Sequence, residues 1–336
     1  MQINFVVTFL RSQKRRGHFE MRILFGSHKD ALGGFLDTLK RSLPEHQFEA
    51  SGRFAGFDTL EDFDVLIPRR SVVDRQSLRT ANRLRLIQQC GAGIENIDVQ
   101  AAKAMNIWVA NVESDISGNA DSVAEIGIYL MIGLSRDFRG ITSSFLNSRV
   151  GTPQGLALRG KTVGVIGLGG IGRALVKRLR GFDVNIIGIK RHGHRQAQEE
   201  LGIGWVGDRT EINKLLRRSD YVVLCLPLTA ENRGLIGRDA FGEMKHDSFL
   251  INLSRGGLVD RAALQDALTT GKIAGAGLDV FWEEPPDPND PIFQYNIMAT
   301  PHIGGVTDLS IQGIVRVVVE NIKRLENGQE PLCLRQ

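Results

Sequence analysis

The chain has 336 residues, of which 42% are hydrophobic and 24% charged, and it carries a formal net charge of +4. This length is enough for two ordinary domains, and the composition is that of a globular protein and excludes an intrinsically disordered chain. The small net positive charge suits an anionic ligand, but the sequence contains no long run of basic residues, so nucleic-acid binding is not expected.

From Met21 onward, short apolar strands alternate with helical stretches. The first half contains predicted strands at 21–26, 65–67, 84–90 and 107–110, and then one long predicted helix at 119–138. A mixed polar arm at 141–160 precedes predicted strands at 162–166, 184–189, 221–226, 249–253 and 274–280, and a final helix at 308–326. This alternation indicates βαβ units, so we predict an α/β fold of two Rossmann-like domains with parallel sheets.

Other features bear on the setting of the protein. No run of about 18 or more apolar residues could span a bilayer, so we expect no membrane partner. Cys90, Cys225 and Cys333 form no CxxC pair, which predicts neither disulfides nor metal binding and favours a cytoplasmic location. We interpret residues 1–20 as an extension outside the folded core, with a targeting segment as the alternative.

A glycine-rich loop at 167–172 follows one predicted strand and opens a helix predicted at 173–180, which is the context that the dinucleotide fingerprint requires. Gly167 permits a tight turn, Gly169 lets the backbone approach a pyrophosphate, and Gly172 allows close packing of helix and strand. The alternative is a glycine-rich turn without a ligand. The predicted cofactor-binding residues of the loop are Gly167, Gly169, Gly170, Ile171 and Gly172.

The end of the next strand bears on the choice of nicotinamide cofactor. An NAD site normally places an acid there, about 20 residues after the loop, where it binds the ribose hydroxyls. Here Lys190, followed by Arg191 and His192, stands 18 residues beyond Gly172. Because basic side chains attract the 2′-phosphate of NADP, we predict that Lys190 and Arg191 favour NADP over NAD. The alternative is a solvated basic turn that discriminates little.

Three further segments, at 251–260, 277–285 and 299–305, complete a set of four motifs in chain order. From Met21 to the C-terminal helix, this set resembles the D-isomer-specific 2-hydroxyacid dehydrogenase family, which includes phosphoglycerate dehydrogenases and glyoxylate or hydroxypyruvate reductases. The resemblance implies hydride transfer between a nicotinamide cofactor and a 2-oxo or D-2-hydroxy acid. It also implies a substrate domain at 21–118 plus 301–336, a dinucleotide-binding domain at 119–300, and an active site in the cleft between them.

The resemblance assigns a catalytic trio. Arg255 would pair with the substrate carboxylate and polarise the 2-oxo group, because a guanidinium is planar and always charged. His302 would protonate the carbonyl oxygen, or take the hydroxyl proton in the reverse direction. Glu284, chosen over Glu283 because it precedes Pro285, would orient His302 and favour its protonated form. Singly, each could be an ordinary cap, turn or surface residue.

The resemblance also places further contacts. Backbone amides at Ala92 and Gly93 would bind the substrate carboxylate together with Arg255. The remaining predicted cofactor contacts are Leu253, Arg255, Asp279 (on the nicotinamide carboxamide side) and Gly304. We expect no metal site, because the other histidines show no ligand spacing, and no serine nucleophile, because no GxSxG elbow occurs. The family is usually dimeric through the cofactor domain, so the helix at 119–138 and the arm at 141–160 are the expected homodimer interface.

Several alternatives stay open. Formate dehydrogenases share the fold but typically carry glutamine where Glu284 stands. Arg69 and Arg70 favour a phosphorylated or otherwise anionic substrate if they face the cleft, and glyoxylate or hydroxypyruvate if they face solvent. No further domain follows Gln336, so feedback control by such a domain is not expected. A nucleotide-sensing, corepressor-like binding protein of the same fold, with little turnover, is the competing function.

Overall fold

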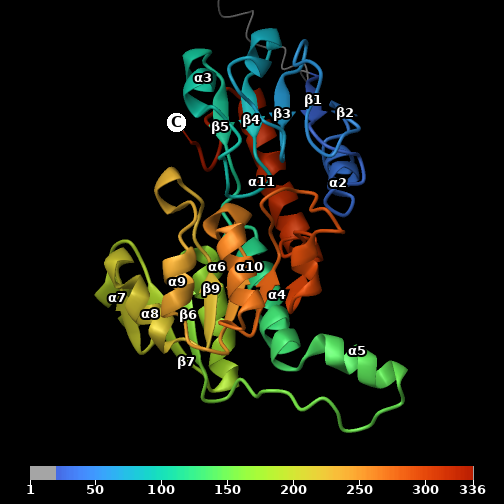
Figure 1. The fold of residues 1–336 in the computed structure, drawn as a ribbon. Coiled ribbons are helices and arrows are strands. Elements are labelled where there is room, and N and C mark those ends of the chain that lie inside the picture. The colour runs from blue at the N-terminus through green and yellow to red at the C-terminus, as the bar shows by residue number, and fades with distance from the viewer. Residues whose placement is uncertain (1–19, 336) are drawn as a thin grey trace, which may run out of the picture. The chain divides into compact units, whose positions relative to one another are not determined.

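The computed structural model describes residues 20–335, so the extension expected at 1–20 lies outside the described residues except for Glu20. The chain divides into two compact units, one formed by the residues up to Glu113 together with those from Ile314, the other by Ser114–Gly313 (Figure 1). The sequence-based boundaries at 118/119 and 300/301 lie a few residues from these divisions. No helix in the described part of the chain is both long and apolar enough to cross a membrane.

The first unit is built on a five-stranded parallel sheet with the order β2-β1-β3-β4-β5. Its strands are β1 (Arg22–Phe25), β2 (Gln47–Ala50), β3 (Val65–Ile67), β4 (Leu86–Gln88) and β5 (Trp108–Ala110). Its helices are α2 (Phe35–Ser42), α3 (Val99–Ala104) and the end of α11 (Asp308–Glu326). Strand β2 was not predicted, because this edge strand is short and leaves alternate residues exposed rather than forming an apolar run.

A buried polar contact joins α11 to the first unit's sheet. The Asn321 side-chain amide donates to Gln88 Oε1 at 2.7 Å, and both side chains are buried. The same asparagine exchanges two hydrogen bonds with the backbone of Leu332. Because a buried amide must satisfy its donors and acceptor, this network fixes the register of α11 on the sheet.

The second unit contains a seven-stranded parallel sheet with the order β12-β11-β10-β9-β6-β7-β8. Its strands are β6 (Thr162–Ile166), β7 (Asn185–Ile189), β8 (Trp205–Gly207), β9 (Tyr221–Leu224), β10 (Phe249–Asn252), β11 (Gly275–Leu278) and β12 (Ile297–Ala299). Its helices are α4 (Asn119–Ser135), α5 (Phe138–Leu146), α6 (Gly170–Leu179), α7 (His194–Leu201), α8 (Ile212–Arg218), α9 (Arg238–Glu243) and α10 (Arg261–Thr269). The predicted α/β fold with parallel sheets is therefore confirmed, although β8 and β12, of three residues each, escaped prediction.

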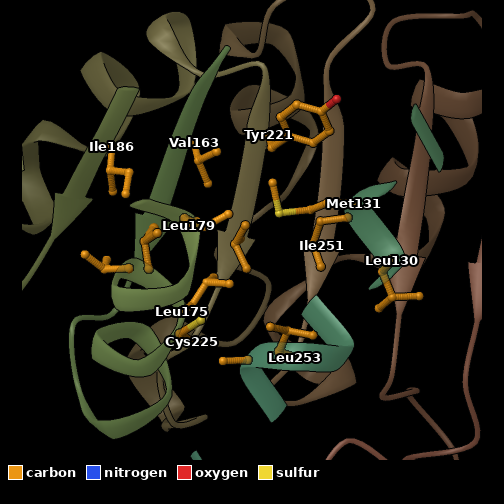
Figure 2. Packing of buried hydrophobic residues seen from close by; sticks show 14 of the residues in the cluster. Leu130, Met131, Val163, Leu175, Leu179, Ile186, Tyr221, Cys225, Ile251 and Leu253 are labelled. Atoms are coloured by element: carbon orange, nitrogen blue, oxygen red, sulfur yellow. The ribbon is translucent and has the colours of Figure 1, made fainter. Parts of the chain in front are cut away.

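Both faces of this sheet are covered, which explains the nearly continuous apolar strands. Successive residues of a strand point to opposite faces, so Val163 and Val223 pack on one side and Ile166 and Val222 on the other. Figure 2 shows the first of these clusters, in which strand residues meet side chains of α4 and α6. The buried hydroxyl of Tyr221, which belongs to this cluster, lies 2.6 Å from Ser135 Oγ, so it is hydrogen-bonded despite its burial.

The long helix predicted at 119–138 is interrupted. α4 ends at Ser135, and Asp137 adopts a left-handed backbone conformation with φ 52° and accepts a hydrogen bond from Gly140 N–H as the N-cap of α5. The predicted polar arm therefore begins with a helix, and it continues without regular structure from Asn147 to Lys161. In Figure 1, α5 and this segment extend away from the sheet of the second unit.

Candidate active site

The glycine loop joins β6 to α6 at the point where strand order reverses between β6 and β9. Gly167 has φ +101°, and a Cβ there would lie 2.7 Å from backbone atoms of Cys225, which follows β9. A Cβ on Gly172 would lie 2.0 Å from the carbonyl oxygen of Gly167. Both positions therefore require glycine for the internal geometry of the turn, as the fingerprint predicts.

Gly169 differs from these two glycines. Its φ is −81°, which any residue can adopt, and among the described residues nothing lies within 4 Å of a Cβ built there. It is the N-cap of α6, a ten-residue helix whose first amides and dipole favour an anion. An open cradle beside a helix N-terminus fits a pyrophosphate, so the loop fits a dinucleotide. Ile171, also predicted to contact the cofactor, is partly buried against the core of the unit.

Lys190 directly follows β7, and Arg191 beside it is exposed. The Lys190 carbonyl contacts His194 Nε2 at 2.8 Å, and its N–H donates to Gly207 O, which fixes the turn. Acids lie near these bases: Lys190 helps to lower the pKa of Glu200, after the larger effects of hydrogen bonds from Arg173 and Gln196.

His302 and Glu284 form a direct pair. His302 Nδ1 lies 3.0 Å from both carboxylate oxygens of Glu284, whose Oε1 also accepts a hydrogen bond from Phe281 N–H at 3.1 Å. The Glu284 side chain is 13% exposed and that of His302 is 32% exposed, so the carboxylate lies behind the ring. Glu283 is exposed. Of the two glutamates, Glu284 is therefore the one that contacts His302, and its catalytic role stays a prediction.

Asp279 holds the loop that carries His302. Its buried carboxylate accepts hydrogen bonds from Thr300 Oγ1 at 2.7 Å, Ile303 N–H at 2.9 Å and Gly304 N–H at 3.0 Å. His302 itself has φ 53°, a left-handed conformation that needs such support. Sequence reasoning assigned Asp279 to the nicotinamide and missed this positioning role, which needs the tertiary contact between β11 and the loop after β12. The nicotinamide contact stays a prediction, as does the contact at Gly304.

Arg255 follows β10, at the carboxyl edge of the sheet that also carries the glycine loop and Asp279. Asn252 fixes the turn: its amide donates to the Arg255 carbonyl at 2.8 Å, and its oxygen accepts from Ser254 N–H at 3.1 Å. Arg255 Nη1 donates to Ser254 O at 2.7 Å. Leu253 is buried in the core against α4, so only its backbone could meet a cofactor.

In the first unit, Ala92 and Gly93 follow β4. The carbonyl of Gly91 accepts from Val112 N–H, and that of Ala92 accepts from Asn111 Nδ2 at 2.7 Å, so the loop is anchored through its oxygens. Within residues 20–335, the N–H groups of Ala92 and Gly93 donate to no protein acceptor. Two adjacent available donors suit a carboxylate ligand, but that contact stays a prediction.

A group with metal-ligand chemistry occurs elsewhere in the first unit. One ligand atom each of Glu45, His46 and Glu326 lies within 4.8 Å of the others. His46 Nε2 is 3.4 Å from Glu326 Oε1, while Nδ1 accepts from Met21 N–H at 3.5 Å. Because Nδ1 accepts a hydrogen bond, the neutral ring carries its proton on Nε2, the nitrogen that faces the carboxylates. A protonated Nε2 cannot be a metal ligand, so this arrangement disfavours a metal ion between His46 and the two glutamates. We assign no metal to this group, and the expected absence of a metal stays a prediction.

The second unit has the architecture of a Rossmann-type dinucleotide-binding domain: β8-β7-β6-β9-β10-β11 follow the strand order of that fold, with the glycine loop at its switch point. Consistent with this class, a model of the "D-isomer specific 2-hydroxyacid dehydrogenase, NAD binding domain" family matches residues 128–304.

Three similar proteins are consistent with this family. The chain is 38% identical to a D-3-phosphoglycerate dehydrogenase of Methanocaldococcus jannaschii over 81% of this chain and 51% of that protein. It is 37% identical to a glyoxylate reductase of Thermococcus litoralis over 77% of this chain and 79% of that protein. Its structure is similar to the apo-structure of D-lactate dehydrogenase from Escherichia coli, with a TM-score of 0.79 and 26% identity, covering 94% of this chain and 100% of the other.

The chain therefore belongs to the D-isomer-specific 2-hydroxyacid dehydrogenase family, as the four motifs predicted, and its second unit contains the NAD-binding domain. It spans about half the length of the phosphoglycerate dehydrogenase that it matches.

Proposed function

We propose that this protein is a nicotinamide-dependent D-2-hydroxyacid dehydrogenase that reduces a small 2-oxo acid such as glyoxylate, hydroxypyruvate or a phosphorylated analogue. The observation that carries the proposal is the His302–Glu284 pair, in which both carboxylate oxygens lie 3.0 Å from Nδ1. A carboxylate behind an imidazole is the arrangement of a positioned general acid. The first unit would serve as the substrate domain and the second as the dinucleotide-binding domain. A substrate site between the units remains a prediction.

Each residue of the trio has a distinct role in this proposal. Bound at the glycine loop, the reduced nicotinamide would supply the hydride. Arg255 would hold the substrate carboxylate and draw electron density toward the 2-oxo oxygen. Because Nδ1 donates to Glu284, His302 would present Nε2–H to that oxygen and transfer its proton as the alcohol forms. The amides of Ala92 and Gly93 would offer further donors to the carboxylate.

The direct test is a reductase assay with a panel of 2-oxo acids, run with NADH and with NADPH. Turnover of at least one small 2-oxo acid to its D-2-hydroxy product is the expected result. If the protein binds a nicotinamide cofactor but reduces no member of the panel, the corepressor-like binding function replaces this proposal. Oxidation of formate in place of any 2-oxo acid reduction would contradict the role given to Glu284.

We further propose a preference for NADP(H), carried by Lys190 and Arg191 at the end of β7. In Lys190→Asp, we expect kcat/KM for NADPH to fall by about tenfold or more relative to NADH, because a charge-assisted contact to the 2′-phosphate is replaced by repulsion. Steady-state kinetics with both cofactors measure this. Lys177→Asp, an exposed site on α6, is the charge-matched control. Equal use of both cofactors by the wild type would contradict the preference.

We also propose that the protein forms a homodimer through α5 and the segment after it. Phe145, Leu146 and Val150 are 83%, 75% and 97% exposed, which is unusual for large apolar side chains so close in sequence. The double variant Phe145→Ser/Val150→Ser should sediment as a monomer while the wild type sediments as a dimer. Val72→Ser, which removes an exposed valine from the first unit, is the control. A monomeric wild type at micromolar concentration would refute the interface.

A further inference from the structure

In the second unit, the segment that leads to Glu284 packs directly against the segment that follows Arg255. Gly256 is buried, and a Cβ built on it would collide with the carbonyl group of Phe281 and with the backbone nitrogen of Trp282. Only glycine lets the two backbones approach this closely. The turn after β10 and the turn after β11 are therefore in direct backbone contact.

The Trp282 side chain adds a directional contact between the same two segments. Its indole Nε1–H donates to the carbonyl oxygen of Val259 at 2.7 Å, and the partly buried ring packs against the hydrophobic cluster that contains Ile166. An indole has one donor and no acceptor, so its hydrogen-bonding capacity is fully used by this contact.

The acceptor of this hydrogen bond is itself held in place. Val259 is 2% exposed and forms a parallel bridge with Ile236. The N–H of Ile236 donates to Leu258 O, and the N–H of Asp260 donates to Ile236 O, each at 3.0 Å, so these bonds flank Val259 on both sides. The N–H of Val259 donates to Gly256 O, also at 3.0 Å. The Val259 carbonyl is thus a fixed anchor for the indole.

The residue before Trp282 contacts the carboxylate that pairs with His302. The N–H of Phe281 donates to Glu284 Oε1 at 3.1 Å, and the same oxygen lies 3.0 Å from His302 Nδ1. The Phe281 side chain is buried and meets the Phe293 ring edge-on, with 5.9 Å between centroids. Because the Phe281 amide helps to set the direction of the Glu284 carboxylate, a contact that immobilises Trp282 also restrains that carboxylate.

We propose that Trp282 is a positioning residue for proton transfer, because its hydrogen bond fixes the segment whose Glu284 carboxylate orients His302. This inference rests on the proposed function, which assigns the transferred proton to His302. The same hydrogen bond ties this segment to the turn that carries Arg255, the proposed partner of the substrate carboxylate. A misplacement of reacting groups by about 1 Å can lower a rate by about 10²-fold, so such a tie between the two segments matters for the reaction.

The test removes the indole donor and keeps an aromatic ring. In Trp282→Phe, kcat for 2-oxo acid reduction should fall by about threefold to tenfold, the usual effect of one hydrogen bond, while KM for the cofactor changes by less than about twofold. The alkaline limb of the pH–rate profile should move to lower pH, because a loosened carboxylate stabilises the protonated imidazole less. Trp205→Phe is the matched control: this ring is also partly buried, but it lies on β8, at the sheet edge farthest from β12, and the change should alter neither property.

A double-mutant cycle distinguishes positioning from a general loss of stability. In the Glu284→Gln background, adding Trp282→Phe should not move the pH–rate profile any further, because the residue through which Trp282 acts has already been changed. A further shift of the same size in the double variant would overturn the proposal, as would a Trp282→Phe enzyme that behaves like Trp205→Phe.

NMR titration of the His302 ring separates failure of this inference from failure of the proposed function, because it needs no turnover. The ring resonance, assigned by its loss in His302→Gln, should titrate at lower pH in Trp282→Phe than in the wild type, even if no 2-oxo acid is reduced. If Trp282→Phe does not fold, Trp282→benzothienylalanine replaces the indole N–H with sulfur and preserves the shape of the ring. An unchanged titration of His302 in the variant that folds would contradict the positioning role.

Discussion

Replacing His302 with glutamine is expected to lower kcat for 2-oxo acid reduction by about 10²- to 10⁴-fold, the usual contribution of a general acid. Glutamine keeps the size and a donor but has no proton to transfer at neutral pH. The effect should fall on kcat rather than on KM for the cofactor, because the ring is assigned to the reacting oxygen alone. Stopped-flow measurement of cofactor oxidation would separate this step from product release. Unchanged single-turnover rates in His302→Gln would contradict the assignment.

Glu284 should act through the imidazole of His302, so replacing Glu284 should change the pH dependence of the rate as well as kcat. A carboxylate beside the ring stabilises the protonated imidazole, which reduction requires and which is lost as pH rises. Glu284→Gln should therefore move the alkaline limb of the pH–rate profile to lower pH, as well as lowering kcat. Glu283→Gln is a matched control one residue away, and it should leave the profile unchanged because its side chain is exposed. Equal effects of the two substitutions would refute the pairing.

Gly169→Ala is expected to weaken cofactor binding by at least tenfold without destabilising the protein. The φ of −81° accommodates alanine, and no described atom lies within 4 Å of the new Cβ, so the folded state has room for it. A bound pyrophosphate would instead meet the methyl group where the backbone must approach it closely. Cofactor affinity from fluorescence titration and the midpoint of thermal unfolding measure the two effects.

Gly172→Ala, in contrast to Gly169→Ala, is expected to destabilise the folded protein. Its Cβ would lie 2.0 Å from Gly167 O, a backbone atom that cannot rotate away, so we expect a loss of about 1–3 kcal/mol or more in the free energy of unfolding. The pair distinguishes a glycine required by the ligand from one required by the fold. If Gly169→Ala binds the cofactor as tightly as the wild type does, the phosphates do not lie at this loop.

Much of this protein can be read from local sequence. The glycine loop was recognisable because an apolar strand precedes it and a helix follows it, and all three features lie within about 20 residues, as in the fingerprint. The helix at 308–326 was predicted with the bounds that the structure has, because a long amphipathic stretch contains its own signal. Strands β2, β8 and β12 were missed because three or four residues give too little periodicity to separate a strand from a loop.

Other properties depend on contacts between residues far apart in sequence. Only the fold distinguishes Glu284 from Glu283, because the choice depends on which carboxylate reaches a histidine 18 residues away. Asp279 acquires its positioning role from the loop after β12, and Arg69 meets Ser27, 42 residues earlier, at the end of a neighbouring strand. The sequence by itself thus determined the fold class, the family and the types of residue that are candidates for catalysis, because each of these can be recognised from a short local motif. The tertiary structure decided which side chains meet, because hydrogen bonds and burial depend on strand order and register.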